Sequence, residues 1–142
     1  MAQTQTVTNT GIAEWVTLMC DTTPSATALY KIVALDMATP CTAAVASTFA
    51  DPADSAVHHT TSGLAIVAID TVAQATKSGG TAGDSVDFDH VFTATAAKNV
   101  AGIHVCNTAG NKTYIECCFN AVLAMESSDT LTIDGQVTAN QT

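Results

Sequence analysis

The chain has 142 residues, a length that suits one domain with a substantial buried core. Its 13 acidic and four basic residues give a net charge of -9, which argues against nucleic-acid binding because phosphate contacts require Lys or Arg. No apolar run approaches the ~20 residues needed to span a bilayer, and the N-terminus lacks the basic and apolar regions of a cleaved signal. We therefore expect neither a membrane protein nor one secreted through a signal peptide.

The surface is predicted to be unusually poor in charge. Charged residues make up 12% of the chain, against roughly 25% in typical globular domains. Hydrophobic residues account for 47%, and small polar residues fill many of the remaining positions. This balance favours a protein whose surface is largely covered by other protein.

An extended segment, a short helix and an interior strand are expected first along the chain. Residues 2–8 alternate Gln, Thr and Val, as in an extended arm or a first strand. Gly11 follows as a helix N-cap, and the run of residues 28–35, ALYKIVAL, has two largely apolar faces that favour an interior strand. The apolar stripe of the expected helix comprises Ile12, Trp15, Val16 and Met19.

The middle of the chain carries weaker patterns. Asp51 as N-cap and Pro52 at the first helical position predict a short helix that ends near Gly63. Residues 64–76, LAIVAIDTVAQAT, form a long strand candidate, and the run KSGGTAGDS after it has the composition of a hairpin loop.

Residues 85–138 contain the clearest strand patterns. Residues 86–95 alternate apolar and polar side chains, which predicts one buried and one wet face. Residues 100–106 and 113–119 flank NTAGN, a turn-forming sequence, and ESSD leads into a last strand at 130–138. The expected fold is mainly β: an antiparallel β-sandwich, jelly-roll or immunoglobulin-like, with one or two short helices. We expect an extended N-terminal arm at residues 1–8 and a single domain at residues 9–142.

The five cysteines show no recognisable disulfide spacing. Cys117 and Cys118 are neighbours on a predicted strand and should point to opposite faces. The sequence favours buried thiols in a reducing cytosol for all five positions, which are Cys20, Cys41, Cys106, Cys117 and Cys118.

Candidate metal sites are weak. A zinc site would combine His104 and Cys106 with Cys117 or Cys118, and with His58 or His59, but metal-binding spacings are missing. The acidic residues Asp84, Asp87 and Asp89 lack the spacing of a calcium loop. There is no nucleophile signature either. The sequence therefore predicts no catalytic residue, cofactor or metal, and no enzyme.

Four segments in order resemble a group of small virion proteins of tailed bacteriophages. The segments are VTNTGIAEWVTLM, YKIVALDMATPCTAAVAST, VDFDHVFTATAAKNVAGIHVCNTAGNKTYIECCF and SSDTLTIDGQVT, which together span most of the chain. The chain departs from the group at Asp36-Met37-Ala38, where a glycine-rich "GTG" is usual. The resemblance implies a structural role, as a decoration or tail-associated protein.

The expected function is that of a capsid decoration or cement protein in the virion, assembled in the host cytoplasm. Its partners would be the major capsid protein or another virion protein, with self-association as a homo-oligomer, for which a trimer is one possibility. The alternative is a tail or fibre module, or a subunit of an extracellular filament. An arm can add a strand to a neighbour, and many copies gain avidity. The expected interface residues are Ala2, Gln3, Thr4, Gln5, Thr6, Val7, Thr8, Val137 and Thr138.

Overall fold

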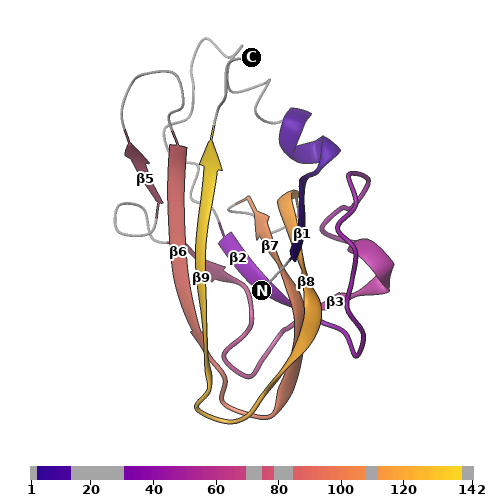
Figure 1. Ribbon diagram of the computed structural model, residues 1–142, viewed down its shortest axis with the longest axis vertical. Helices are drawn as coiled ribbons and strands as arrows, with labels where there is room; N and C mark the ends of the chain where they lie inside the picture. Colours follow the sequence, from indigo (N-terminus) through magenta and orange to yellow (C-terminus); the bar gives the residue numbers. More distant parts are fainter. Residues whose placement is uncertain (1–2, 14–30, 70–74, 79–84, 108–111, 139–142) are drawn as a thin grey trace.

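Two antiparallel sheets form the framework of the molecule (Figure 1). The computed structural model describes residues 3–13, 31–69, 75–78, 85–107 and 112–138. The large sheet has the order β1 (Gln3–Val7), β8 (Thr113–Met125), β7 (Lys98–Cys106), β2 (Lys31–Asp36), β3 (Val57–His58), and β4 (Val67–Ala68) also pairs with β2. The small sheet has the order β5 (Ala75–Ser78), β6 (Ser85–Thr93), β9 (Thr130–Thr138). The prediction of an antiparallel β-sandwich is confirmed.

The main core lies between the two sheets. Ile103 from the large sheet joins Phe92 and Ile133 from the small sheet in one buried cluster. Burial of such side chains contributes about 1.5–3 kcal/mol each, so this layer is the main source of stability. The other buried members are Ile32, Ala34, Leu64, Ile69, Ala94, Val100, Val105, Cys117, Phe119 and Met125.

The strands follow the predicted alternation closely. On β6, Phe92 is 1% exposed whereas Asp89, Val91 and Thr93 face outward, so the expectation of one wet face is confirmed where the side chains are described. The predicted strand at 28–35 corresponds to β2, and its interior position is confirmed because β7 flanks it on one side and β3 and β4 on the other. The hairpins β5–β6 and β7–β8 are likewise confirmed.

A long segment packs on the other face of the large sheet. We call residues 37–56 the covering segment; Figure 1 shows it on the side of the large sheet that faces away from β6 and β9. Beneath it lies a second apolar cluster, made of Leu35, Cys41, Ala56, Ala101 and Cys118. The large sheet is therefore buried on both faces, which explains why β2 and β7 are apolar on both.

The helix predicted from Asp51 to Gly63 is wrong. Only a 3-10 turn forms there, η1 (Ala53–Ser55), and the chain then enters β3. Asp54 and Ser55 have φ values of 55° and 63°, in the left-handed region that a right-handed helix cannot contain. His58 and His59 consequently lie in and just after a strand.

The strand predicted at residues 64–76 is divided between the two sheets. β4 pairs with β2 in the large sheet, whereas β5 pairs with β6 in the small sheet. The residues between β4 and β5 therefore include the crossing from one sheet to the other, and those at 70–74 lie outside the described part of the chain. The apolar composition runs on through both halves, so composition alone could not show the change of sheet.

Residues 3–7, predicted as an arm or a first strand, form β1 at the edge of the large sheet. A short helix follows at residues 9–13, and its N-cap is Thr8, whose hydroxyl accepts a hydrogen bond from the Gly11 N–H at 3.1 Å. The prediction of Gly11 as N-cap is therefore wrong. Gly11 is needed for a close approach, because a Cβ there would lie 2.5 Å from the Tyr114 carbonyl oxygen. Trp15, Val16 and Met19 lie outside the described residues.

Candidate functional site

A group of polar side chains is buried between the large sheet and the covering segment. The register of β7 and β8 places His104 directly opposite Glu116. Both side chains are fully buried, and the His104 Nε2 atom lies 2.7 Å from Glu116 Oε1. His58 from β3 and Thr113 from β8 complete the group on the other side of the His104 ring.

Glu116 is the centre of this group because its carboxylate accepts four hydrogen bonds. Oε1 accepts from His104 Nε2 and from the Ala53 N–H at 3.0 Å. Oε2 accepts from the Ala44 N–H at 2.9 Å and from the Ser47 hydroxyl at 2.7 Å. Three of the four donors belong to the covering segment, so this one carboxylate attaches the segment to the sheet.

These bonds keep Glu116 ionised. Burial alone would raise the pKa of the carboxyl, but the hydrogen bond from His104, together with those from the covering segment, outweighs burial and lowers the pKa to about 2. The carboxylate is therefore charged throughout the range in which proteins normally operate.

The two histidines share one hydrogen-bonded path. Since His104 Nε2–H donates to Glu116, its Nδ1 is free to accept, and it lies 2.9 Å from His58 Nε2 and 3.0 Å from the Thr113 hydroxyl. Burial, reinforced by the nearby His104, lowers the pKa of His58 to about 4. His58 is therefore neutral near pH 7, and its ring stacks on Phe49 with the centroids 4.1 Å apart.

The order carboxylate, imidazole, hydroxyl in Glu116, His104 and Thr113 resembles a nucleophile triad. All three side chains are 0% exposed, so a substrate cannot reach the Thr113 hydroxyl. The backbone carbonyl of Thr113 also accepts a hydrogen bond from the Thr8 hydroxyl, which ties β8 to the start of the helix. The geometry supports a structural role for this group, which holds the covering segment on the large sheet.

Glu116 is not among the site residues predicted from the sequence. A signal was present, because Glu116 is the one charged residue in the apolar strand run TYIECCF, and a buried charge on a strand needs a partner. Once the β7–β8 register is known, His104 is the partner directly opposite. No such local signal in the sequence indicated that the covering segment donates hydrogen bonds to Glu116.

Of the residues of the weak zinc candidate, His58 and His104 come together, with 2.9 Å between their ring nitrogens, but the cysteines do not join them. Cys106 shares a face with His104, but its Sγ donates to the Lys31 carbonyl at 3.5 Å, and burial raises the pKa of the thiol to about 12. Cys117 points into the core between the sheets, and His59 Nε2 lies 2.7 Å from the Asn99 carbonyl. In the described part of the chain, no three His, Cys, Asp or Glu side chains are grouped to hold a metal.

The acidic candidate is described only in part. Asp84 lies outside the described residues, and for Asp87 only the strand position is described. Asp89 is exposed on β6, directly opposite Asp134 of β9.

Cys41 and Cys118 form a disulfide, which corrects the prediction of five buried thiols. The two cysteines are 77 residues apart in sequence, and only the packing of the covering segment on β8 brings them together. Cys106 and Cys117 are buried free thiols, as predicted. Cys117 and Cys118 do point to opposite faces of the sheet, since they belong to different apolar clusters.

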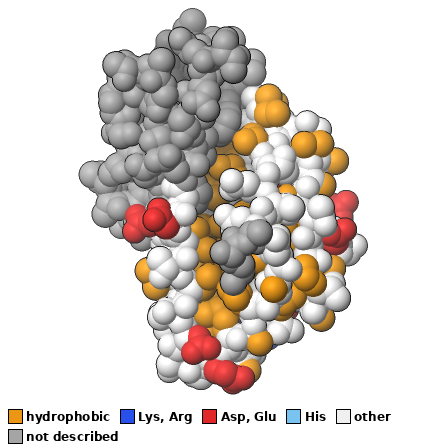
Figure 2. All heavy atoms as spheres, in the orientation of Figure 1, with side chains coloured by type: hydrophobic (Ala, Val, Ile, Leu, Met, Phe, Trp, Pro, Cys, Tyr) orange, Lys and Arg blue, Asp and Glu red, His pale blue; other side chains and the backbone are white. Residues whose placement is uncertain are grey.

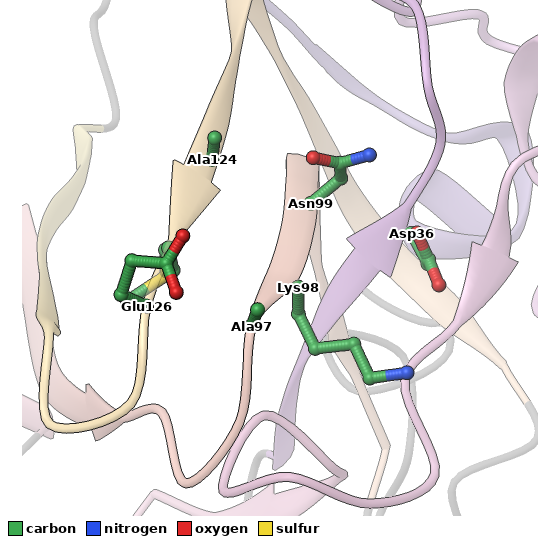
Figure 3. Close-up of a pocket in the computed structure, with 7 residues that line it drawn as sticks. Asp36, Ala97, Lys98, Asn99, Ala124 and Glu126 are labelled. Carbon is green, nitrogen blue, oxygen red and sulfur yellow. The ribbon is translucent and has the colours of Figure 1, made fainter.

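A pocket of about 350 Å³ opens at the ends of β7 and β8 (Figure 3). Glu126 lies on one side, and Asp36 and Lys98 lie on the other. Its lining also includes the Asn99 side chain and three apolar residues, Ala97, Ala124 and Met125. Glu126 faces Asp36 and Lys98 across this space, and such a mixture of charges does not select a class of ligand.

The expected interface residues lie on edge strands of the two sheets. β1 is the terminal strand of the large sheet, with Gln3, Thr4 and Gln5 exposed, whereas Thr8 is fully buried. Val137 and Thr138 end β9, where they pair with Val86 and Ser85 of β6. Ala2 lies outside the described residues.

Comparison with known proteins finds no relative of this chain. No protein-family model, curated protein or solved structure matches the chain. A search of the described residues for a helix long and apolar enough to cross a membrane also finds none.

Proposed function

We propose that the chain is a structural protein of a phage virion, acting as a capsid decoration or cement protein through protein–protein contacts. The observation that carries the proposal is the open edge of β1. Its five residues, QTQTV, carry no charge, and within the described residues no strand pairs with the edge of β1 that faces away from β8. Edge strands are usually protected by charge, proline or a bulge, so an unprotected one favours strand addition.

Two further features support an assembly role. The covering segment is held by both a disulfide and the Glu116 hydrogen bonds, which gives a durable scaffold without an accessible reactive group at that site. An exposed apolar side chain also lies near the β1 end of the large sheet: Val45 is 55% exposed, and its carbonyl accepts a hydrogen bond from the Asn9 N–H. A polar edge beside apolar side chains is typical of a protein contact surface.

The location and copy number of the chain in purified particles test the proposal. Imaging of intact particles, with quantitative mass spectrometry of their proteins, should find hundreds of copies on the head surface. A handful of copies on the tail would support the tail or fibre alternative instead. Absence of the chain from the particles would refute both.

Particle binding by purified variants tests the contact surface. Gln3→Lys in β1 should weaken binding, whereas Thr93→Lys, on the exposed face of β6, is the matched control. Deletion of residues 2–8 is less informative, because it would also remove β1 from the sheet. Unchanged binding by the Gln3→Lys variant would show that β1 is not the contact surface.

A further inference from the structure

We propose that β1 pairs antiparallel with β1 of a second copy of this chain, with Gln5 opposite Gln5 on a two-fold axis. The large sheets of the two copies would then join into one. This inference rests on the proposed function only in treating β1 as an assembly surface. It names the partner at that surface, which the proposed function leaves open.

The hydrogen-bond pattern determines which residues of β1 face outward. The β1–β8 register ends with Val7 opposite Ile115, and one residue further on the Thr8 N–H donates to the Tyr114 carbonyl at 3.0 Å. In an antiparallel ladder, hydrogen-bonded and non-bonded pairs alternate. Thr4 and Thr6 therefore bond to β8 like Thr8, while the residues between them direct their backbone N–H and C=O groups away from β8. These outward residues are Gln3, Gln5 and Val7.

Among the described strands, none occupies this outward edge from Gln3 to Val7. Its next member would be Asn9, but the Asn9 N–H already donates to the Val45 carbonyl at 2.9 Å, which closes the edge at that end. Within the described residues, no strand pairs with the outer side of β1, and the Val7 carbonyl has only a 3.3 Å contact with the Thr6 hydroxyl. A partner strand thus has Gln3, Gln5 and Val7 to pair with.

The outward backbone groups of Gln3, Gln5 and Val7 can pair with the same groups of a second copy. When two copies run antiparallel about Gln5, Gln3 lies opposite Val7 of the second copy, and Val7 lies opposite Gln3. Every outward N–H then faces an outward C=O, so the pairing satisfies the backbone groups of both copies. Such a two-fold contact uses the same surface on both subunits and closes at a dimer.

Charge favours this edge over that of β9. Two chains of net charge -9 repel, so a contact between copies needs an uncharged surface. β1 has no charge, whereas β9, the other long edge strand, carries the exposed Asp134. β3 and β4 are two residues long, which is too short for a template.

The surface beside the edge is also apolar. Figure 2 shows hydrophobic side chains running down the middle of one face, with acidic side chains at its margins. In the same orientation, β1 and β9 lie on either side of this strip (Figure 1). A two-fold axis through β1 places the small sheets of both copies on the same side of the joined large sheet. The apolar strips of the two copies then face each other and are withdrawn from water.

Sedimentation analysis of the full chain from about 1 µM to about 500 µM tests the inference, since small interfaces associate in this range. We expect a species of twice the 14.5 kDa mass that grows with concentration. Gln5→Lys should weaken dimerisation at least about tenfold, because it places two like charges opposite each other. Gln5→Glu should do the same. The exposed Gln5 side chain makes both variants compatible with folding.

A mixture of the two variants tests the register. Equal amounts of the Gln5→Lys and Gln5→Glu variants should form a mixed dimer, because opposite charges then meet at the axis. Thr93→Lys, an exposed substitution on β6, should dimerise like the natural chain. A monomer at all concentrations would overturn the inference, as would a dimer that neither Gln5 variant weakens. A weakened dimer that the mixture does not restore would overturn the Gln5–Gln5 register.

The tests of β1 self-pairing and of the virion role can fail independently. A chain that decorates particles but stays monomeric at high concentration would refute β1 self-pairing and leave the virion role intact. A chain that dimerises through Gln5 but is absent from particles would refute the virion role and leave the self-pairing intact.

Discussion

Replacing Glu116 by Gln tests how the covering segment is held. The substitution keeps the size and shape of the side chain but turns one carboxylate oxygen into an amide NH2. Each oxygen of Glu116 accepts two hydrogen bonds, one of which comes from a backbone N–H, of Ala53 or of Ala44. Whichever way the amide is turned, its NH2 therefore faces one of these two backbone N–H groups.

The expected loss of stability follows from this geometry. Leaving a buried donor unsatisfied costs about 1–3 kcal/mol, and the remaining bonds lose the added strength of an ionised acceptor. The lowered pKa, which results from the same hydrogen bonds, agrees with this range: a fall from 4.5 to about 2 on folding corresponds to roughly 3 kcal/mol. We therefore expect Glu116→Gln to lower the free energy of unfolding by about 3 kcal/mol near pH 7, and the melting temperature by roughly 10 °C.

The pH dependence identifies the cause. Because the folded pKa of Glu116 lies below its ordinary value, its contribution is fully present above about pH 4.5 and is lost as the pH falls towards 2. Urea unfolding followed by far-UV circular dichroism should thus show the natural chain and the variant converging in stability over that range. Glu126→Gln, which removes an exposed carboxylate, should leave the neutral-pH stability unchanged.

Two results would refute this reasoning. One is a Glu116→Gln variant within about 0.5 kcal/mol of the natural chain, the range of ordinary surface substitutions. The other is a stability difference that is the same at about pH 3 as at about pH 7, since the carboxylate charge would then not be its source.

The remaining predictions concern His58 and the cysteines. Because the pKa of His58 is about 4 in the folded chain rather than 6.5, its protonation destabilises the fold as the pH falls from 6.5 to 4. The free energy of unfolding of His58→Phe should therefore change less over this pH range than that of the natural chain. Reduction of the Cys41–Cys118 disulfide should lower the free energy of unfolding by roughly 4 kcal/mol, given the sequence separation of 77, and the loss should appear as a lower urea midpoint with reductant than without. Burial raises the pKa values of Cys106 and Cys117 to about 12 and about 11, so alkylation near pH 8 followed by peptide mapping should find both unmodified until denaturant is added; modification of either in the folded chain would contradict their burial.

Local patterns in the sequence were sufficient to predict most of the strands. β6 alternates apolar and polar residues, NTAGN separates β7 from β8, and ESSD precedes β9, so each strand is specified by its own residues and adjacent turns. The β-sandwich followed from these signals. The interior position of β2 also followed, because both of its faces are apolar.

Where local patterns failed, tertiary contacts decided the conformation. Asp51 and Pro52 are a reasonable helix start, yet the next residue, Ala53, donates its N–H to Glu116 of the large sheet, and Asp54 takes a left-handed conformation. The strand pattern at residues 64–76 likewise contained no mark of the change from one sheet to the other. In both places, contacts with distant strands outweighed propensities worth less than about 1 kcal/mol per residue.

The sequence by itself determined most of the strands, the hairpins and the scarcity of charge, because each depends on neighbouring residues or on composition. Only the tertiary structure decided that Cys41 meets Cys118, that Glu116 holds the covering segment, and that β1 pairs with β8 and leaves Gln3, Gln5 and Val7 facing outward. These features join residues far apart in the chain, and many alternative pairings satisfy the same local patterns. The choice among them is made when the apolar faces of the sheets and the covering segment are buried together.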